Sequence, residues 1–477
     1  MMRRPLALLL SLALALPVQA LDLPDLGDVA ASELSPAAER RIGEQIIQQI
    51  RWRDAAYLDD PEVEEYVNRL GHRLVAASED PLREFDFFVV RDSTLNAFAL
   101  PGGYIGVHSG LILAARSESE LASVLGHEIA HVTQRHIAQL FGKQSQTSMV
   151  MLASLLVAVL AARSNSQVSQ AAIAAGQAGA IQSQLGYTRG FEREADRVGL
   201  QTLEQAGFDV RGMPGFFERL QRDSRLYENN APAYLRTHPL TTERIADMEN
   251  RASSMPYRQV LDSPEFGYVR AKLRAQAGAA ADAVRQMQEG VERHPDDAAA
   301  RYGLGRALLR AARFDEAAAV VDELRADVAS SPWVDTLAAE IRLARKDGVG
   351  ALALLEAARQ RHPGYRSLEY ALAEAQIQAG KPAAAVVGMR KALTQRGGDA
   401  RLWLLLSRAN AELGRRTAQH RAQAEVYVLR GSVPAAIEQL EIARKAGDGD
   451  FYELSAVDAR LRELKTRLRE DREAERN

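Results

Sequence analysis

The first half of the chain alternates helical patterns with one short stretch of β pattern. Apolar side chains recur three and four positions apart over residues 35–53 and 61–77, which predicts two amphipathic helices. Residues 85–90, 97–100 and 104–108 are rich in β-forming side chains, and a Pro-Gly-Gly turn separates the last two segments. The pattern therefore predicts a small sheet accompanied by helices.

A helix that carries two histidines follows this sheet. Apolar residues keep a helical rhythm in the stretch 121–141, and neither Pro nor Gly follows His127 within it. His127 and His131 are four positions apart, so both imidazoles lie on one helix face and can reach one metal ion. Glu128 can then face a water bound to that ion. The alternative is a pair of histidines on an exposed helix face, because HExxH recurs by chance in unrelated helices.

A second stretch with helical spacing, at residues 187–199, supplies candidates for a third ligand. A zinc helix with two histidine ligands needs a third protein ligand and an open position for water. Glu192 and Asp196 share a helix face; one carboxylate can bind zinc, and the other can accept a hydrogen bond from the outer nitrogen of a ligand histidine. Glu194 points about 200° away from Glu192 and is the weaker candidate. Interleaved arginines leave a salt-bridged surface helix as the alternative.

The other histidines divide into two groups. The three-histidine zinc motif is excluded, because Gln134 and Ile137 stand where it requires Gly and His. His136 lies off the metal face and is interpreted as a surface histidine or as one that supports a ligand. His238, in a Thr-His-Pro loop, can stabilise an oxyanion, occupy the open metal position, or simply pack the loop. Five histidines without metal-like spacing are interpreted as structural: His72, His108, His294, His362 and His420.

Two further segments of this half carry functional hypotheses. In zinc peptidases of this helix type, an exposed sheet edge beside the metal accepts the substrate as an added strand. The candidate edge is formed by Gly103, Tyr104, Ile105, Gly106 and Val107, with a plain structural hairpin as the alternative. Met149–Ala162 is apolar almost throughout and too short to span a bilayer. It is interpreted as a buried helix, with a mobile flap or a membrane-surface contact as alternatives.

From about residue 262 the pattern changes to Ala-, Leu- and Arg-rich helices joined by short turns. Comparable turns recur every 34 residues, at Arg313, Asp347, Lys381 and Arg415. This period is the signature of tetratricopeptide repeats, which stack into a curved solenoid with a concave surface. We predict about four repeats within residues 262–477, ended by a charged capping helix over residues 456–477. The concave surface can dock a protein partner, or the repeats can act as a rigid spacer.

The N-terminus has the pattern of a secretory signal peptide. A basic start, an apolar run rich in Leu and Ala, and Val-Gln-Ala make up residues 1–20, which predicts cleavage after Ala20. The run is shorter than the roughly 20 residues of a spanning helix, so an uncleaved anchor is disfavoured and no transmembrane anchor is expected after cleavage. No cysteine follows the run, which excludes a lipid anchor there. Between this cleavage site and the start of the repeats, residues 21–261 are predicted to form the catalytic domain.

Composition narrows the function classes. A chain of 477 residues is too long for one core, so two or three domains are expected. The chain has no cysteine, which excludes disulfides, cysteine-ligated zinc and a cysteine nucleophile. A net charge of −3, with no basic cluster that carries interleaved aromatic residues, gives no sign of nucleic-acid binding.

In combination these motifs resemble the BepA-type periplasmic metallopeptidases, within the wider HtpX-like gluzincins. The resemblance implies a mainly α (α+β) zinc-peptidase domain with a small sheet, followed by an all-α repeat solenoid. It also implies that His127, His131 and Glu192 bind one Zn²⁺, that Glu128 is the general base, and that Asp196 is a functional acid behind the ligands. His238 matches a loop histidine that can cap the zinc and hold the enzyme inactive.

The resemblance also implies a setting. It suggests a periplasmic endopeptidase that degrades misassembled or unfolded outer-membrane proteins, assists their assembly as a chaperone, and contacts the β-barrel assembly machinery through its repeats. The alternative is a chaperone or scaffold whose zinc site is capped and mainly inactive. Glu128 favours the enzyme, because binding zinc does not require it.

Overall fold

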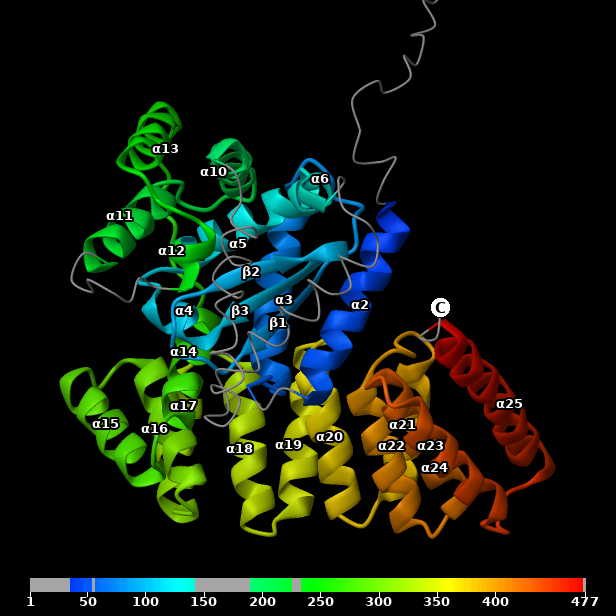
Figure 1. Ribbon diagram of the computed structural model, residues 1–477. Coiled ribbons are helices and arrows are strands. Elements are labelled where there is room, and N and C mark those ends of the chain that lie inside the picture. Colours follow the sequence, from blue (N-terminus) through cyan, green and yellow to red (C-terminus); the bar gives the residue numbers. More distant parts are fainter. Residues whose placement is uncertain (1–34, 54–55, 142–188, 225–232, 475–477) are drawn as a thin grey trace, which may run out of the picture.

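The computed structural model is mainly helical with one small sheet, which confirms the predicted fold class (Figure 1). It describes residues 35–53, 56–141, 189–224 and 233–474. The predicted signal peptide and the apolar segment Met149–Ala162 lie outside the described residues.

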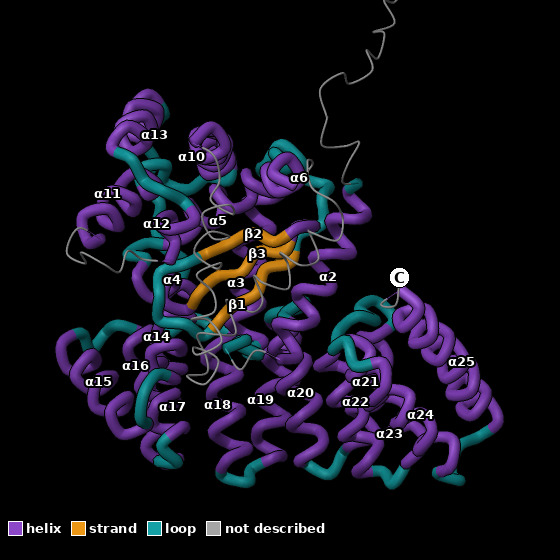
Figure 2. The backbone as a smooth tube through the Cα atoms, viewed as in Figure 1, coloured by secondary structure: helices purple, strands orange, loops and turns teal. Residues whose placement is uncertain are grey.

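The sheet has three strands, and all three were predicted (Figure 2). They are β1 (Asp86–Val90), β2 (Ala97–Leu100) and β3 (Tyr104–His108), with the short 3-10 turn η1 (Pro101–Gly103) before β3. The turn needs glycine, because φ is 77° at Gly102 and a side chain there would collide with the backbone of α2 (Pro36–Arg53).

The prediction that Gly103, Tyr104, Ile105, Gly106 and Val107 form the sheet edge is wrong. The strand order is β1-β3-β2, so β3 is the central strand. The η1 turn folds β2 back onto one side of β3 as an antiparallel partner, and β1 pairs in parallel with the other side. Hydrogen bonds on both sides leave β3 no free edge, and among the described strands β2 is the outer strand packed against the histidine helix.

Helices surround the sheet in this half of the chain. Their bounds are α3 (Pro61–Val75), α4 (Ser109–Ala114), α5 (Glu118–Thr133), α6 (His136–Phe141), α10 (Arg189–Gln205), α11 (Gly212–Ser224), α12 (Ala233–Thr237) and α13 (Thr242–Ser254). The side chain of Ser117 caps α5 by accepting a hydrogen bond from the backbone of Glu120. Helices α5 and α10 cross where Gly126 and Gly199 face each other; a β-carbon on Gly126 would lie 3.2 Å from the Gly199 carbonyl oxygen. Two glycines thus let the helices approach closely.

The second half is built of helix pairs with the predicted 34-residue period. The helices are α14 (Pro264–Gln276), α15 (Ala280–Arg293), α16 (Ala298–Arg310), α17 (Phe314–Asp327), α18 (Pro332–Ala344), α19 (Gly348–Arg361), α20 (Arg366–Gln378), α21 (Pro382–Leu393), α22 (Ala400–Glu412), α23 (Arg416–Leu429), α24 (Val433–Lys445) and α25 (Phe451–Ala474). The four turn residues predicted from the sequence are the N-caps of α17, α19, α21 and α23. Five pairs share this register, from α14–α15 to α22–α23, one more than the predicted four or so, and α24 and α25 follow them.

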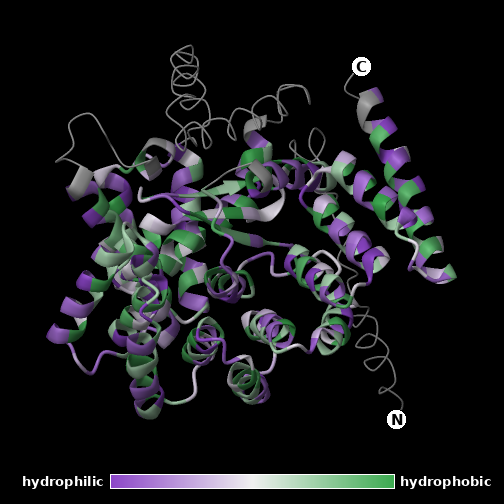
Figure 3. Ribbon diagram, turned by 90° about the horizontal axis from the view of Figure 1, so that it is seen from below, coloured by the Kyte–Doolittle hydropathy of each residue, from purple (hydrophilic) through white to green (hydrophobic). Residues whose placement is uncertain are grey.

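The repeats curve around the first half of the chain. Viewed from below, the repeat helices form an arc with the sheet on its inner side (Figure 3). Helix α3 lies against this inner side: Lys272 of α14 contacts Asp60, the N-cap of α3, at 2.7 Å, and Arg306 of α16 contacts Glu62 at 2.7 Å. One continuous hydrophobic core runs from Leu58 to Ala375. The repeats up to α20 therefore share their core with the domain that precedes them.

Candidate metal centre

Three elements bring four candidate ligands to one point. Helix α5 supplies His127 and His131, α10 supplies Glu192, and the loop after α12 supplies His238. One nitrogen or oxygen of each lies within 4.8 Å of those of the other three. All four side chains are buried, with at most 1% of each residue exposed. The close α5–α10 crossing therefore places the carboxylate of one helix beside the imidazoles of the other.

The donor atoms suit a small tetrahedral cation. The Nε2 atoms of His127 and His131 are 3.0 Å apart, and Glu192 oxygens lie 3.6 and 3.5 Å from them. Nδ1 of His238 lies 3.1 Å from Glu192 Oε1 and 3.4 Å from His127 Nε2. Two or three imidazoles and one carboxylate are a donor set that zinc prefers. Within the described residues, these four side chains form the one group of three or more His, Asp or Glu close enough together to hold a metal ion.

Glu128 lies beside this cluster of candidate ligands. It is fully buried, and neither carboxylate oxygen has a hydrogen-bond partner among the described residues. Nε2 of His238 lies 3.5 Å from Oε1 of Glu128. A buried carboxylate without a hydrogen bond is costly, so this position suits a group that exchanges a proton with a water or a substrate.

A second set of side chains holds the ligands from behind. Asp196 Oδ1 lies 3.1 Å from Nδ1 of His127. Arg244 donates to both oxygens of Asp196 at 2.7 Å each, lies 2.8 Å from Glu192 Oε2, and donates to the carbonyl oxygen of Pro239 at 2.7 Å. One guanidinium thus connects the third candidate ligand, the acid behind His127 and the loop that carries His238. Sequence reasoning gave Arg244 no role, because its distance along the chain from Asp196 is 48 positions.

Burial and neighbouring charges set the protonation of the centre. Burial raises the pKa of Glu128, which favours a carboxyl that can both take and return a proton. Burial lowers the pKa of His127, but hydrogen bonds to Asp196 and Glu192 outweigh it and raise the pKa to about 9. Burial, and then the charge of His127, hold the pKa of His131 well below its usual range, which keeps a neutral imidazole ready to bind a cation.

The structure separates the remaining candidates. The Glu194 side chain is 41% exposed and lies outside the cluster, in line with its lower rank. His136 is fully buried, so its interpretation as a surface residue is wrong; its Nδ1 lies 2.9 Å from Nδ1 of His131. Tyr234, which sequence reasoning missed, is buried with its ring stacked on His238 at a centroid distance of 4.6 Å. Its position four residues before His238 on a short helix is the one signal that could have indicated it.

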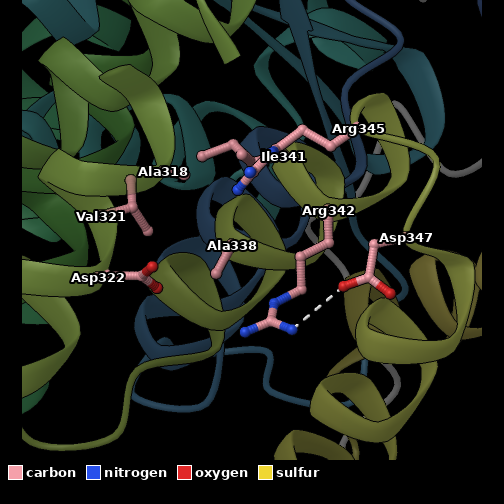
Figure 4. A pocket seen from close by; sticks show the side chains of 8 residues that line it. All are labelled: Ala318, Val321, Asp322, Ala338, Ile341, Arg342, Arg345 and Asp347. Carbon is pink, nitrogen blue, oxygen red and sulfur yellow. Dashed lines mark hydrogen bonds and ion pairs between the residues drawn. The ribbon is translucent and has the colours of Figure 1, made fainter. Parts of the chain in front are cut away.

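The repeats contain pockets that are separate from this centre. One, of about 250 Å³, lies between α17 and α18 (Figure 4). Its arginines are already paired, Arg342 with Asp347 at 3.3 Å and Arg345 with Asp315 at 3.2 Å. Its lining residues include no histidine.

Comparison with known proteins identifies the family. The model of peptidase family M48 matches residues 61–252, and a tetratricopeptide repeat model matches residues 274–341 and 342–409. A β-barrel assembly-enhancing protease from Yersinia pestis is 34% identical over 455 residues, covering 94% of this chain and 93% of that protein. The chain belongs to this family. Its Escherichia coli K12 relative of the same name is 33% identical over 448 residues, covering 93% and 91% of the two chains.

More distant relatives match a smaller part of the chain. The mitochondrial metalloendopeptidase OMA1 of Schizosaccharomyces pombe is 32% identical over 184 residues, which cover 39% of this chain and 51% of that protein. The chain is therefore an M48 metallopeptidase with C-terminal tetratricopeptide repeats, and the predicted family and enzyme class are confirmed. None of the helices in the described parts of the chain is long and apolar enough to cross a membrane.

Proposed function

We propose that the chain is a zinc-dependent endopeptidase with His127, His131 and Glu192 as ligands. The convergence of these three side chains around one point, with the buried Glu128 beside them, is the observation that supports this most strongly. Zinc bound there supplies a Lewis acid and lowers the pKa of its water to about 7.

The residues around the metal then divide the work. Glu128 takes a proton from the attacking water and passes it to the nitrogen of the leaving amine, a role that its raised pKa suits. Asp196 accepts from Nδ1 of His127 and so keeps Nε2 free to bind. His238 stands at the fourth position of the cluster, where it caps the site; released from there, its imidazole can donate to the oxyanion.

The substrate binds as an extended strand along β2. This outer strand packs against α5, so a peptide added to it runs past Glu128. The names of the relatives refer to β-barrel assembly. We infer that the substrates are unfolded or misassembled outer-membrane proteins and that the repeats contact the assembly machinery. We also infer that the chain is exported to the periplasm and cleaved after Ala20.

A second function has one observation in its favour. His238 completes a set of four donors, and a zinc ion with four protein ligands leaves no position for water. In that state the protein acts as a chaperone or scaffold and not as a protease. The two functions then belong to the uncapped and capped forms of one centre.

The test is zinc content and cleavage of an unfolded protein, measured side by side for wild type, Glu128→Gln and His238→Ala. We expect one zinc per chain in all three, a loss of cleavage of about 100-fold or more in Glu128→Gln, and faster cleavage in His238→Ala. Cleavage by Glu128→Gln at the wild-type rate would overturn the mechanism. If all three proteins bind zinc and none cleaves the unfolded protein, the scaffold function is supported instead of the protease.

A further inference from the structure

The two ligand histidines are supported in different ways. Behind His127 stands the buried carboxylate of Asp196, 3.1 Å from Nδ1. Behind His131 stands another imidazole: Nδ1 of His136 lies 2.9 Å from Nδ1 of His131. Nε2 of His136 in turn lies 3.2 Å from Oε2 of Glu194. The far end of this second chain of contacts is a carboxylate on the surface-facing side of α10.

A strained turn brings His136 to this position. In a continuous helix a residue five positions after His131 would point away from it. Here α5 ends, Arg135 adopts a φ of 55°, and α6 starts at His136. Residues other than glycine rarely adopt this backbone conformation, and strain of this kind persists where the surrounding structure requires it. The His136 ring is then fixed by stacking on Phe191, with centroids 4.4 Å apart and planes 15° apart.

Metal binding would fix the donor and the acceptor in each hydrogen bond of the series that runs from His131 through His136 to Glu194. His131 faces the cluster with Nε2, which lies 3.0 Å from Nε2 of His127, so its proton must be on Nδ1. That N–H has Nδ1 of His136 in front of it, which must therefore accept. The proton of His136 is then on Nε2, where it donates to Glu194.

We propose that His136 and Glu194 form a positioning relay, in which His136 holds the metal-binding tautomer of His131 and Glu194 holds that of His136. This inference rests on the proposed zinc site and deepens it. Outer hydrogen bonds of this kind typically affect metal affinity by about 10- to 100-fold. His136 is a positioning residue, since it acts on the metal only through His131.

Two substitutions at His136 separate this role from simple packing. His136→Phe keeps an aromatic ring for Phe191 and removes the acceptor; His136→Asn loses the ring and keeps an oxygen near the position of Nδ1. Zinc affinity is measured by competition with a chromophoric chelator, on the full chain. The relay predicts about 10- to 100-fold weaker zinc binding in His136→Phe, with binding close to that of wild type in His136→Asn. A packing role predicts the opposite order.

Further variants control for loss of folding and test Glu194, the last residue of the relay. His420→Phe, a histidine substitution in α23 far from the centre, should bind zinc as wild type does. Glu194→Ala, at a half-exposed site that tolerates truncation, should weaken zinc binding, and Glu194→Gln should restore it because its amide oxygen still accepts. Wild-type zinc affinity in both His136→Phe and Glu194→Ala overturns the relay. Wild-type protein that binds no zinc overturns both proposals, whereas zinc binding in the predicted order without proteolysis overturns only the proposed function.

Discussion

At the scale of single residues, Arg244 joins the two carboxylates of the centre. It is 3% exposed and faces two buried carboxylates, Asp196 and Glu192. Burial lowers the pKa of Arg244, but its hydrogen bond to Asp196 outweighs burial and raises the pKa above its usual range. Two acids this close together, in a site shielded from water, need a permanent cation between them.

Replacing Arg244 should lower the stability of the protein far more than replacing an arginine at the surface. We expect Arg244→Met to lower the free energy of unfolding by about 3–5 kcal/mol, because it leaves two buried charges with one partner fewer. Urea unfolding of zinc-free protein measures the loss. Arg193→Met is the matched control: Arg193 is 53% exposed and pairs with Glu243 at 3.0 Å, so its loss should cost less than about 1 kcal/mol. Equal losses in the two variants would contradict this account.

At the scale of elements, the α5–α10 crossing has no room for a side chain. A β-carbon on Gly199 would lie 3.0 Å from the backbone nitrogen of His127 and 3.1 Å from its α-carbon. We expect Gly199→Ala to push α10 away from α5, weaken zinc binding and cost about 1–3 kcal/mol in stability. Chelator competition and thermal unfolding report the two effects. Gly215→Ala in α11, where nothing lies within 4 Å, should instead stabilise by up to about 1 kcal/mol.

Each of the five 34-residue helix pairs also repeats one backbone conformation. The second residue after the first helix of each pair has a positive φ: 58° at Gly278, 56° at Ala312, 63° at Lys346, 71° at Gly380 and 69° at Gly414. This left-handed conformation ends a helix and costs a residue other than glycine about 1–2 kcal/mol. The second and third pairs are therefore strained where the others are not.

Glycine should relieve that strain. We expect Ala312→Gly and Lys346→Gly each to stabilise the protein by up to about 1 kcal/mol, since the relief exceeds the added entropy of the unfolded chain. Thermal unfolding of both single variants and of the double variant tests this. Ala311→Gly, one position earlier with a φ of −79°, should destabilise. A loss of stability in Ala312→Gly would show that the left-handed turn carries no strain.

At the scale of the whole molecule, α3 joins the catalytic half to the repeats through buried charges. Asp60 caps α3 and also accepts from Lys272 of α14 at 2.7 Å. Burial raises the pKa of Asp60, but the Lys272 ammonium outweighs burial and lowers the pKa to about 2. Because its folded pKa lies below the unfolded value of 3.8, Asp60 stabilises the fold above pH 4, and this contribution disappears as the pH falls towards 2.

The junction should therefore weaken in acid through this residue. We expect wild type to exceed Asp60→Asn in unfolding free energy by about 2 kcal/mol at pH 6. The difference should shrink between about pH 4 and pH 2. Urea unfolding across this range measures both proteins, and asparagine keeps the helix cap, so the comparison isolates the charge. A difference that stays constant from pH 6 to the acid limit would exclude Asp60 as the titrating group.

The sequence alone determined what depends on local spacing. A separation of four positions places His127 and His131 on one helix face, and a period of 34 residues places the repeat turns, because both follow from the fixed geometry of a helix. The three strands and their Pro-Gly-Gly turn are local in the same sense.

The tertiary structure decided which distant segments meet. It placed β3 in the centre of the sheet, Arg244 between two carboxylates, and His136 behind His131 after a strained turn at Arg135. It also set α3 against the inner side of the repeats. Each of these depends on how helices and strands pack, and packing is a property of many residues at once that no short spacing encodes.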